Sequence, residues 1–177
     1  DHPVDRVWEF FGRIAEVAAC LPGASLTSEP ADGHVEGRIK VKVGPINTDF
    51  QGIAEVTRDE ATRSGTIIGS GKDQRSNSST RGRIGYQVKA GDRPDQTRVD
   101  VTIGYTLTGA LAQFGRSGLV QDIANRLMAV FAQNLEARLA GREDGRSAAT
   151  EFDAGSLVTQ ALIGRIKLFC KRLFMRK

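Results

Sequence analysis

The first twenty residues carry two short apolar patterns of helical period. Pro3 stands where a first-turn proline would, and apolar residues follow it at i, i+3, i+4 and i+7, namely Val4, Val7, Trp8 and Phe11. A second short helix is predicted over residues 13–19. It ends in the sequence CLPG at 20–23, because proline cannot continue a helix and glycine permits a turn.

The middle of the chain alternates apolar and polar residues with the period of two that is typical of half-buried strands. Five strands are predicted, over residues 34–43, 48–56, 66–73, 83–89 and 97–107. The last is the clearest, because its apolar residues alternate almost without a break, as Val99, Val101, Ile103, Tyr105 and Leu107. Successive strands that are polar on one side predict an antiparallel meander.

From Leu119 the apolar residues take the period of a helix. They form a broad stripe that ends before Gly141 and consists of Val120, Ile123, Ala124, Leu127, Val130, Phe131 and Leu135. So wide an apolar face needs an apolar surface to cover it, and the preceding curved sheet is the surface available. We therefore expect an α+β fold over residues 1–140, in which an antiparallel sheet grips one long helix.

Two further segments differ from this body in composition. Residues 141–155 contain three glycines, several charges and no periodicity, which is typical of a flexible linker. Residues 156–177 place apolar residues on one arc of a helical wheel with cations beside it, which predicts an amphipathic membrane anchor. Its membrane-binding residues would be Leu162, Arg165, Ile166, Lys167, Phe169, Lys171, Arg172, Leu173, Phe174, Arg176 and Lys177. The alternative is a helix that packs on the body or on a partner protein.

The formal charge of +4 comes from this tail. Residues 1–140 carry 17 basic and 17 acidic side chains, whereas residues 156–177 carry six basic side chains and no acidic one. A domain that binds nucleic acid would need a basic face on its body, so nucleic acid is not an expected partner. Each cation near an anionic lipid surface contributes about 1 kcal/mol, so the tail predicts such a surface as a partner.

Residues that commonly carry catalysis or bind metals are scarce. His2 is terminal and His34 lies on the polar side of a strand, so neither is placed as a buried general base. Cys20 and Cys170 form no paired-cysteine zinc motif and fit a reducing compartment. The sequence GSGKD at 69–73 lacks the spacing of a phosphate-binding loop. We expect no catalytic residue and no metal site.

The inward strand positions are apolar almost throughout. Tyr86 and Tyr105 are the only polar side chains expected among them. Such a face predicts either an apolar cavity or an ordinary filled core, because both have the same sequence pattern.

Five short sequences precede the long helix in a characteristic order: CLPG at 20–23, VKVGPI at 41–46, DFQG at 49–52, GSGKD at 69–73 and GALAQFGR at 109–116. Over about residues 3–139 the chain resembles the CoxG family of carbon monoxide dehydrogenase subunits, which belongs to the START/Bet v 1-like (SRPBCC) superfamily. This resemblance implies a helix-grip fold with a seven-stranded antiparallel sheet and a hydrophobic tunnel. The first strand expected before the initial helix is absent, which would leave one edge of the sheet exposed, and residue 1 is not Met, so we expect a preceding segment.

The resemblance also implies a function. Members are associated with attachment of the molybdenum-containing carbon monoxide dehydrogenase to the cytoplasmic face of the bacterial inner membrane. They are expected to be non-enzymatic and to bind a respiratory quinone such as menaquinone, with no covalently bound cofactor. The tunnel would be lined by Val41, Val43, Phe50, Ile67, Tyr86, Val88, Val101, Ile103, Tyr105, Gln113, Phe114, Arg116, Ile123 and Leu127. Of these, Tyr86, Tyr105, Gln113 or Arg116 could bind the quinone head group.

Two alternatives stay open at this point. One is a recruitment adaptor for a molybdenum oxidoreductase, with a filled core and a lipid-binding tail. The other is an enzyme of the same superfamily, such as a cyclase or a hydrolase, although the lack of an inward acid or histidine counts against it.

Overall fold

The computed structural model describes residues 1–43, 46–116, 118–142 and 152–153. The elements follow in the order α1 (Val4–Phe11), α2 (Ile14–Cys20), β1 (Ala24–Leu26), β2 (His34–Val43), β3 (Ile46–Asp59), β4 (Ser64–Asp73), β5 (Ser78–Ala90) and β6 (Thr97–Thr108). A 3-10 helix, η1 (Gly109–Arg116), then leads into the long helix α3 (Leu119–Leu139), and β7 (Phe152–Asp153) comes last. This order confirms the predicted α+β fold.

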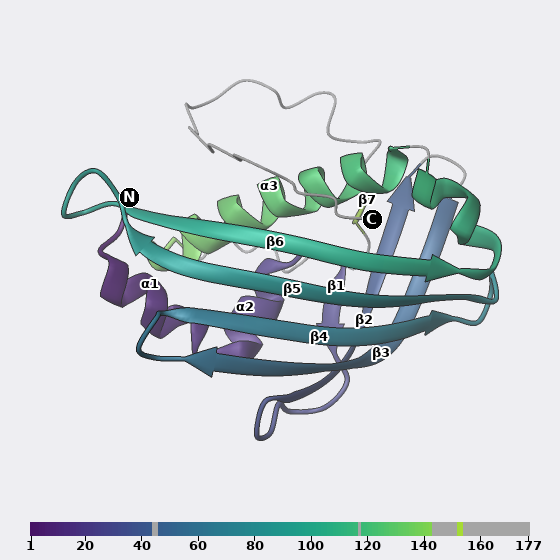
Figure 1. Ribbon diagram of the computed structural model, residues 1–177, viewed down its shortest axis with the longest axis horizontal. Helices are drawn as coiled ribbons and strands as arrows, with labels where there is room; N and C mark the ends of the chain where they lie inside the picture. The colour runs from purple at the N-terminus through teal and green to yellow at the C-terminus, as the bar shows by residue number, and fades with distance from the viewer. Residues whose placement is uncertain (44–45, 117, 143–151, 154–177) are drawn as a thin grey trace.

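Strands β1 to β6 form one curved antiparallel sheet in chain order, and β7 pairs in parallel with β2. Helix α3 crosses the concave side of this sheet, as a helix-grip fold requires (Figure 1). Among the described strands, β6 pairs with β5 alone and therefore forms one edge of the sheet. The seventh strand is β7 and not a strand before α1.

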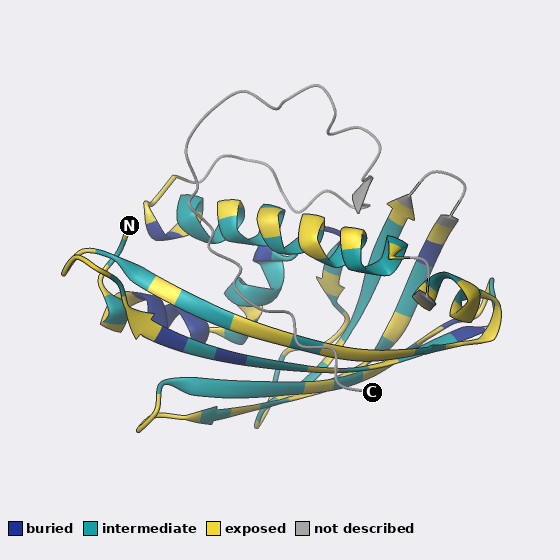
Figure 2. Ribbon diagram, turned by 45° about the horizontal axis from the view of Figure 1, so that its top comes forward, coloured by how far each residue is buried: buried dark blue, intermediate teal, exposed yellow. Residues whose placement is uncertain are grey.

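The fully buried apolar side chains gather where α1, α2 and the last turn of α3 meet the sheet, which we call the closed end (Figure 2). They are Val7, Trp8, Phe10, Phe11, Cys20, Tyr86, Val88 and Leu139. The Tyr86 ring packs against Phe11 and Trp8 with ring centroids 5.0 and 6.4 Å apart. Asn134 Nδ2 donates to the Cys20 carbonyl at 2.9 Å, which joins α3 to α2. This end of the molecule therefore has a conventional packed core.

Arg58 on β3 holds α1 against the β3–β4 hairpin. Its guanidinium lies 4.0 Å from the Trp8 ring centroid and donates to the Trp8 carbonyl at 3.3 Å. The Trp8 Nε1–H donates in turn to the Glu60 carboxylate. A cation over an indole ring contributes about 0.5–2 kcal/mol, so this contact adds to the packing of the closed end.

The β2–β3 hairpin, the β4–β5 turn and η1 lie at the opposite end of the sheet, which we call the open end (Figure 1). Hydrogen bonds hold this end together. The Asp73 carboxylate, 1% exposed, accepts from the Arg75 N–H at 3.0 Å and the Ser76 hydroxyl at 2.9 Å. The buried Ser78 hydroxyl accepts from the Leu111 N–H at 3.1 Å, which fixes η1 to β5.

Strand β7 lies within the segment that the sequence predicts to be a linker. Its residues 152 and 153 pair with Val41 and Lys42 of β2. Residues 143–151 and 154–177 lie outside the described residues, and so do all the membrane-binding residues predicted in the tail. The linker and the anchor otherwise stay predictions.

Candidate functional site

The register of the sheet places the strand residues predicted to line a tunnel on one face. Directly paired residues of antiparallel strands point to the same side. Ile67 pairs with Ile84 and Ile84 with Ile103, while Tyr86 pairs with Val101. We call the side that carries Tyr86 the inner face, and its predicted lining residues are Val41, Phe50, Ile67, Tyr86, Val88, Val101, Ile103 and Tyr105.

The inner face has two regions that differ in burial. Tyr86 and Val88, at 7% and 3% exposure, are covered by α1 and belong to the closed-end core. Val101 and Tyr105 on β6 are 39% and 38% exposed. The other predicted lining residues of the strands, Val41, Phe50, Ile67 and Ile103, are partly buried. Beyond the closed end, the sheet therefore keeps an apolar surface that nothing in the described residues fully covers.

Helix α3 shows the same incomplete burial. Of its 21 described residues, Leu139 in the last turn is the one that is fully buried. Ile123 and Leu127, predicted to face the tunnel, are partly buried, and Figure 2 shows the helix in teal and yellow over most of its length. A filled core would bury such side chains almost completely. The helix and the inner face thus each keep apolar side chains that are incompletely buried.

The centre of the inner face consists of residues with small side chains or none. They form two adjacent rows across the sheet, Gly37, Gly52 and Gly71 in one and Ala54, Gly69 and Gly82 in the other. At Gly52 a β-carbon would lie 2.0 Å from the Ser70 carbonyl oxygen, so glycine is needed there for the strands to pair. These rows remove side-chain bulk from the face that α3 crosses.

The residues predicted to bind a quinone head group are divided between the two ends. Tyr86 lies in the closed-end core, and burial raises the pKa of its hydroxyl, which keeps that group neutral. Tyr105 lies near the end of β6, and Gln113 is exposed on the η1 helix that follows. The structure does not bring Tyr86 to this second pair. The side chains of Val43 and Arg116 lie outside the described ones, while Phe114 is partly buried.

The prediction that Tyr86 and Tyr105 are the only inward polar side chains was wrong. Arg58 shares the inner face because it pairs with Gly65, which pairs with Tyr86. Thr48, Asp73 and Ser78 are also buried, at 5%, 1% and 0% exposure. The buried three lie near strand ends, where turn and backbone partners satisfy polar groups that alternation alone would place inward.

Asp73 is thus an inward acid, but its oxygens accept hydrogen bonds within the β4–β5 turn. Its environment is that of a structural turn residue. In the described part of the chain, no three histidine, cysteine or acidic side chains are close enough together to hold a metal ion. No described helix is long and apolar enough to cross a membrane.

The sequence analysis missed a polar hollow of about 150 Å³ at the open end of the sheet. Its lining residues are Asp49, Gln51, Lys72, Asp73, Gln74 and Arg75. Arg38 donates two hydrogen bonds to the Asp49 carboxylate, which lowers the pKa of that carboxyl. The run KDQR at 72–75 was the available signal, because it concentrates charge at one turn.

Comparisons with known proteins agree with this geometry. A family model for CoxG, described as a subunit of carbon monoxide dehydrogenase, matches residues 1–140. A conserved protein from Geobacillus kaustophilus superposes with a TM-score of 0.69 at 15% identity, covering 79% of this chain and 90% of that one. The Zhui aromatase/cyclase from Streptomyces sp. R1128 superposes with a TM-score of 0.54 at 14% identity, covering 80% and 88%. At such identities these structures show a shared fold alone. No curated protein matches the sequence.

Proposed function

The chain belongs to the CoxG family of carbon monoxide dehydrogenase subunits, and from this premise we propose that it is a non-enzymatic carrier of a prenylated quinone such as menaquinone. The ligand lies between α3 and the inner face. The protein brings it to the molybdenum-containing carbon monoxide dehydrogenase at the cytoplasmic face of the bacterial inner membrane. The observation that carries this proposal is the apolar surface that stays accessible on both α3 and the sheet.

The chemistry of a prenylated quinone suits this surface. Its isoprenoid chain is apolar, and burial of apolar area contributes about 25 cal/mol per Å². Val101, Ile103 and Leu127 offer such area without reorganising the closed-end core. A quinone carbonyl needs only a hydrogen-bond donor, and the Tyr105 hydroxyl or the Gln113 amide supplies one.

The enzyme alternative has less support. One solved structure with a similar fold is an aromatase/cyclase, but at 14% identity the likeness extends to the fold only. A cyclase or hydrolase needs a titratable group poised beside its substrate. Asp73 is engaged in a turn, and the Tyr86 hydroxyl has a raised pKa and lies in the core. These features support a binding role.

The carrier proposal is tested by filling the space that it requires. Ile103→Trp and Leu127→Trp should abolish binding of menaquinone in detergent, measured by native mass spectrometry and by the ligand-induced rise in Tm. Ile53→Trp is the matched control, because Ile53 is 64% exposed on the opposite face of β3 and the variant should bind normally. If the original protein shows neither a bound quinone nor a thermal shift, the carrier proposal is wrong.

The same variants separate the carrier from the recruitment adaptor. If the protein is a carrier, the tryptophan variants should still bring the dehydrogenase to vesicles but should no longer sustain electron transfer to membrane quinone. An adaptor with an ordinary core should sustain both, because it uses the interior for stability alone. The readout is quinone reduction in vesicles supplied with the dehydrogenase and each variant.

A further inference from the structure

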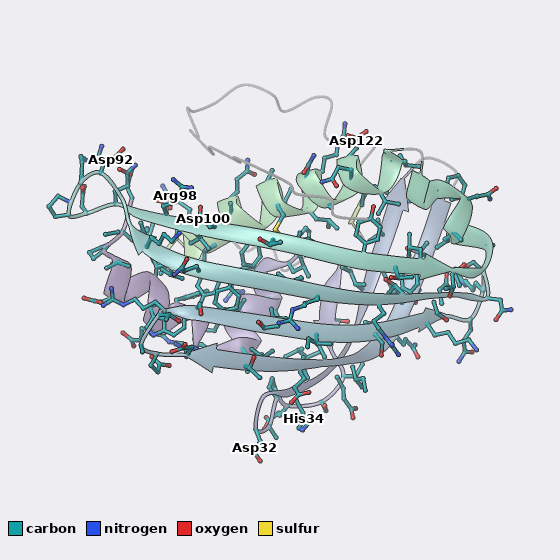
Figure 3. All side chains as sticks on the ribbon, viewed as in Figure 1. Asp32, His34, Asp92, Arg98, Asp100 and Asp122 are labelled. Atoms are coloured by element: carbon teal, nitrogen blue, oxygen red, sulfur yellow. The ribbon has the colours of Figure 1, made fainter. Side chains whose placement is uncertain are left out.

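The cations of the body have different surroundings at its two ends. At the closed end, ion pairs join Arg13 to Glu9 and Glu16, Arg58 to Glu60, Arg63 to Asp5, and Arg93 to Asp1 and Asp95. Towards the same end of β6, Asp100 binds both Lys89 and Arg98. Figure 3 shows Asp92, Arg98 and Asp100 on that side of the molecule. Most of the cations there are thus paired with acids, although Arg6, Arg138 and Arg142 are also exposed near this end and form no ion pair within the described residues.

At the open end, exposed cations have no such partners. Lys42, Lys72 and Arg75 are exposed and form no ion pair within the described part of the chain. Of the two acids beside them, Asp49 is ion-paired with Arg38, whereas Asp73 is buried and accepts from the neutral Arg75 N–H and Ser76 hydroxyl. Asp122, in the first turn of α3, is the exposed acid that Figure 3 shows at this end. The open end thus presents three exposed cations that form no ion pair within the described part of the chain, although Asp49 and Asp73 lie near two of them.

Strand β7 brings the end of the chain to the same place. It pairs with Val41 and Lys42, next to the β2–β3 hairpin of the open end. β7 ends at Asp153, and residues 156–177, with six basic side chains and no acidic one, follow shortly after it in the sequence. The attachment point of the basic tail and the unpaired cations of the body therefore share one end.

We propose that the open end is the membrane-facing surface of the body, where Lys42, Lys72 and Arg75 bind the phosphates of anionic lipid head groups. Lysine and arginine bind phosphate oxygens through charge-assisted hydrogen bonds. Lys72 and Arg75 also line the hollow of about 150 Å³, but Asp49 and Asp73 line it too, so the phosphates are bound by the exposed cations and not inside the hollow. The paired closed end turns away from the bilayer.

The evidence for this orientation does not depend on the proposed carrier function, but the use of the orientation does. It directs the incompletely covered part of the inner face, with Tyr105 and Leu127, towards the layer in which a prenylated quinone is dissolved. A patch of unpaired cations also suits an acidic protein surface. The shared location with the tail attachment favours lipid, because the tail has the pattern of a membrane anchor.

Depth-sensitive fluorescence tests the orientation with the full chain. In a Cys170→Ser background, Cys20 is fully buried and stays unlabelled, so a single fluorophore can be placed by Gln74→Cys at the open end. Ala61→Cys, in the exposed β3–β4 hairpin of the closed end, is the matched control. Vesicles of phosphatidylcholine and phosphatidylglycerol that carry spin-labelled head groups should quench the first probe more strongly. Equal quenching, or stronger quenching at residue 61, overturns the proposal.

Charge removal tests the named residues. Lys72→Gln with Arg75→Gln should weaken partitioning to these vesicles by about fivefold per residue, because each contact with anionic lipid is worth about one tail cation. Arg63→Gln with Arg93→Gln removes the same charge at the closed end and should leave partitioning nearly unchanged. Equal losses would show that only net charge matters and would overturn the proposal. Loss of dehydrogenase binding with unchanged vesicle binding would assign the patch to a protein partner instead.

None of these readouts contains a quinone, so they stay valid if the carrier proposal fails. If that proposal holds, the Lys72→Gln and Arg75→Gln variant should extract menaquinone from vesicles more slowly than the original protein. Its affinity for menaquinone in detergent should not change, because neither residue lies on the inner face.

Discussion

The Tyr86 ring lies across the position where a side chain at Gly65 would begin. A β-carbon there would lie 2.3 Å from both Cζ and Oη of Tyr86. The ring cannot move without losing its contacts with Trp8 and Phe11, so Gly65→Ala should lower the free energy of unfolding by about 1–3 kcal/mol. Gly85→Ala on β5 is the control, because nothing lies within 4 Å of its β-carbon. That variant should be neutral or stabilising by up to about 1 kcal/mol. Urea denaturation measures both, and equal losses would contradict the prediction.

The pair of Arg38 and Asp49 should make stability depend on pH. The hydrogen bonds from Arg38 lower the pKa of the Asp49 carboxyl. A carboxyl with a lowered folded-state pKa contributes stability that is fully present above its ordinary value of about 3.9 and is lost as the pH falls through the folded value. Asp49→Asn should therefore lose less of its Tm than the original protein when the pH is taken from neutral to below that range. Circular dichroism measures the Tm of both proteins at each pH. If both lost the same amount of Tm, the pair would not contribute to stability.

The two halves of α3 should respond differently to truncation. Leu139 is 5% exposed in the closed-end core, whereas Leu127 is partly buried over the inner face. Leu139→Ala should lower the free energy of unfolding by about 2–5 kcal/mol, as for other buried leucines. Leu127→Ala should cost clearly less in the absence of ligand, because part of its side chain is already accessible to water. Similar losses in urea denaturation would mean that the core is filled along the whole helix.

The elements that could be predicted from the sequence are those with an unbroken period. The pattern predicted α1, β2 and α3 within a few residues of their observed bounds. β1 was not predicted, because three residues are too few to show alternation. β5 begins at Ser78 and not at residue 83, because its first part is polar or glycine and shows no apolar alternation.

The candidate site could be predicted only in part, for a related reason. The period of two identified the inner face, because alternation follows directly from strand geometry. It could not tell whether α3 covers that face completely, since packing depends on helix position and on glycine rows such as Gly37 to Gly71. The buried Asp73 and Ser78 were missed because their partners belong to a turn and to η1, which alternation does not describe.

Across the described residues, burial of apolar side chains falls from the closed end to the open end, and local stability should fall with it. Amides that open only when the core unfolds exchange most slowly. In the absence of ligand, hydrogen exchange should therefore be slowest in α1, around Tyr86 and in the last turn of α3. The first half of α3 and the end of β6 should exchange faster, since Ile123 there is only partly buried and Tyr105 is 38% exposed.

Menaquinone should slow hydrogen exchange at the open end and leave the closed end unchanged. A ligand that binds only the folded state stabilises it by mass action, and its contacts would lie on the first half of α3 and on β6. We expect added quinone to slow exchange in those segments and to leave α1 unchanged, as followed by mass spectrometry of peptides. The Ile103→Trp and Leu127→Trp variant should show slow exchange there before any ligand is added, and no further change after it. If quinone slowed hydrogen exchange equally at both ends, the ligand would not occupy the incompletely covered face. A ligand bound on that face should protect mainly the segments that it contacts.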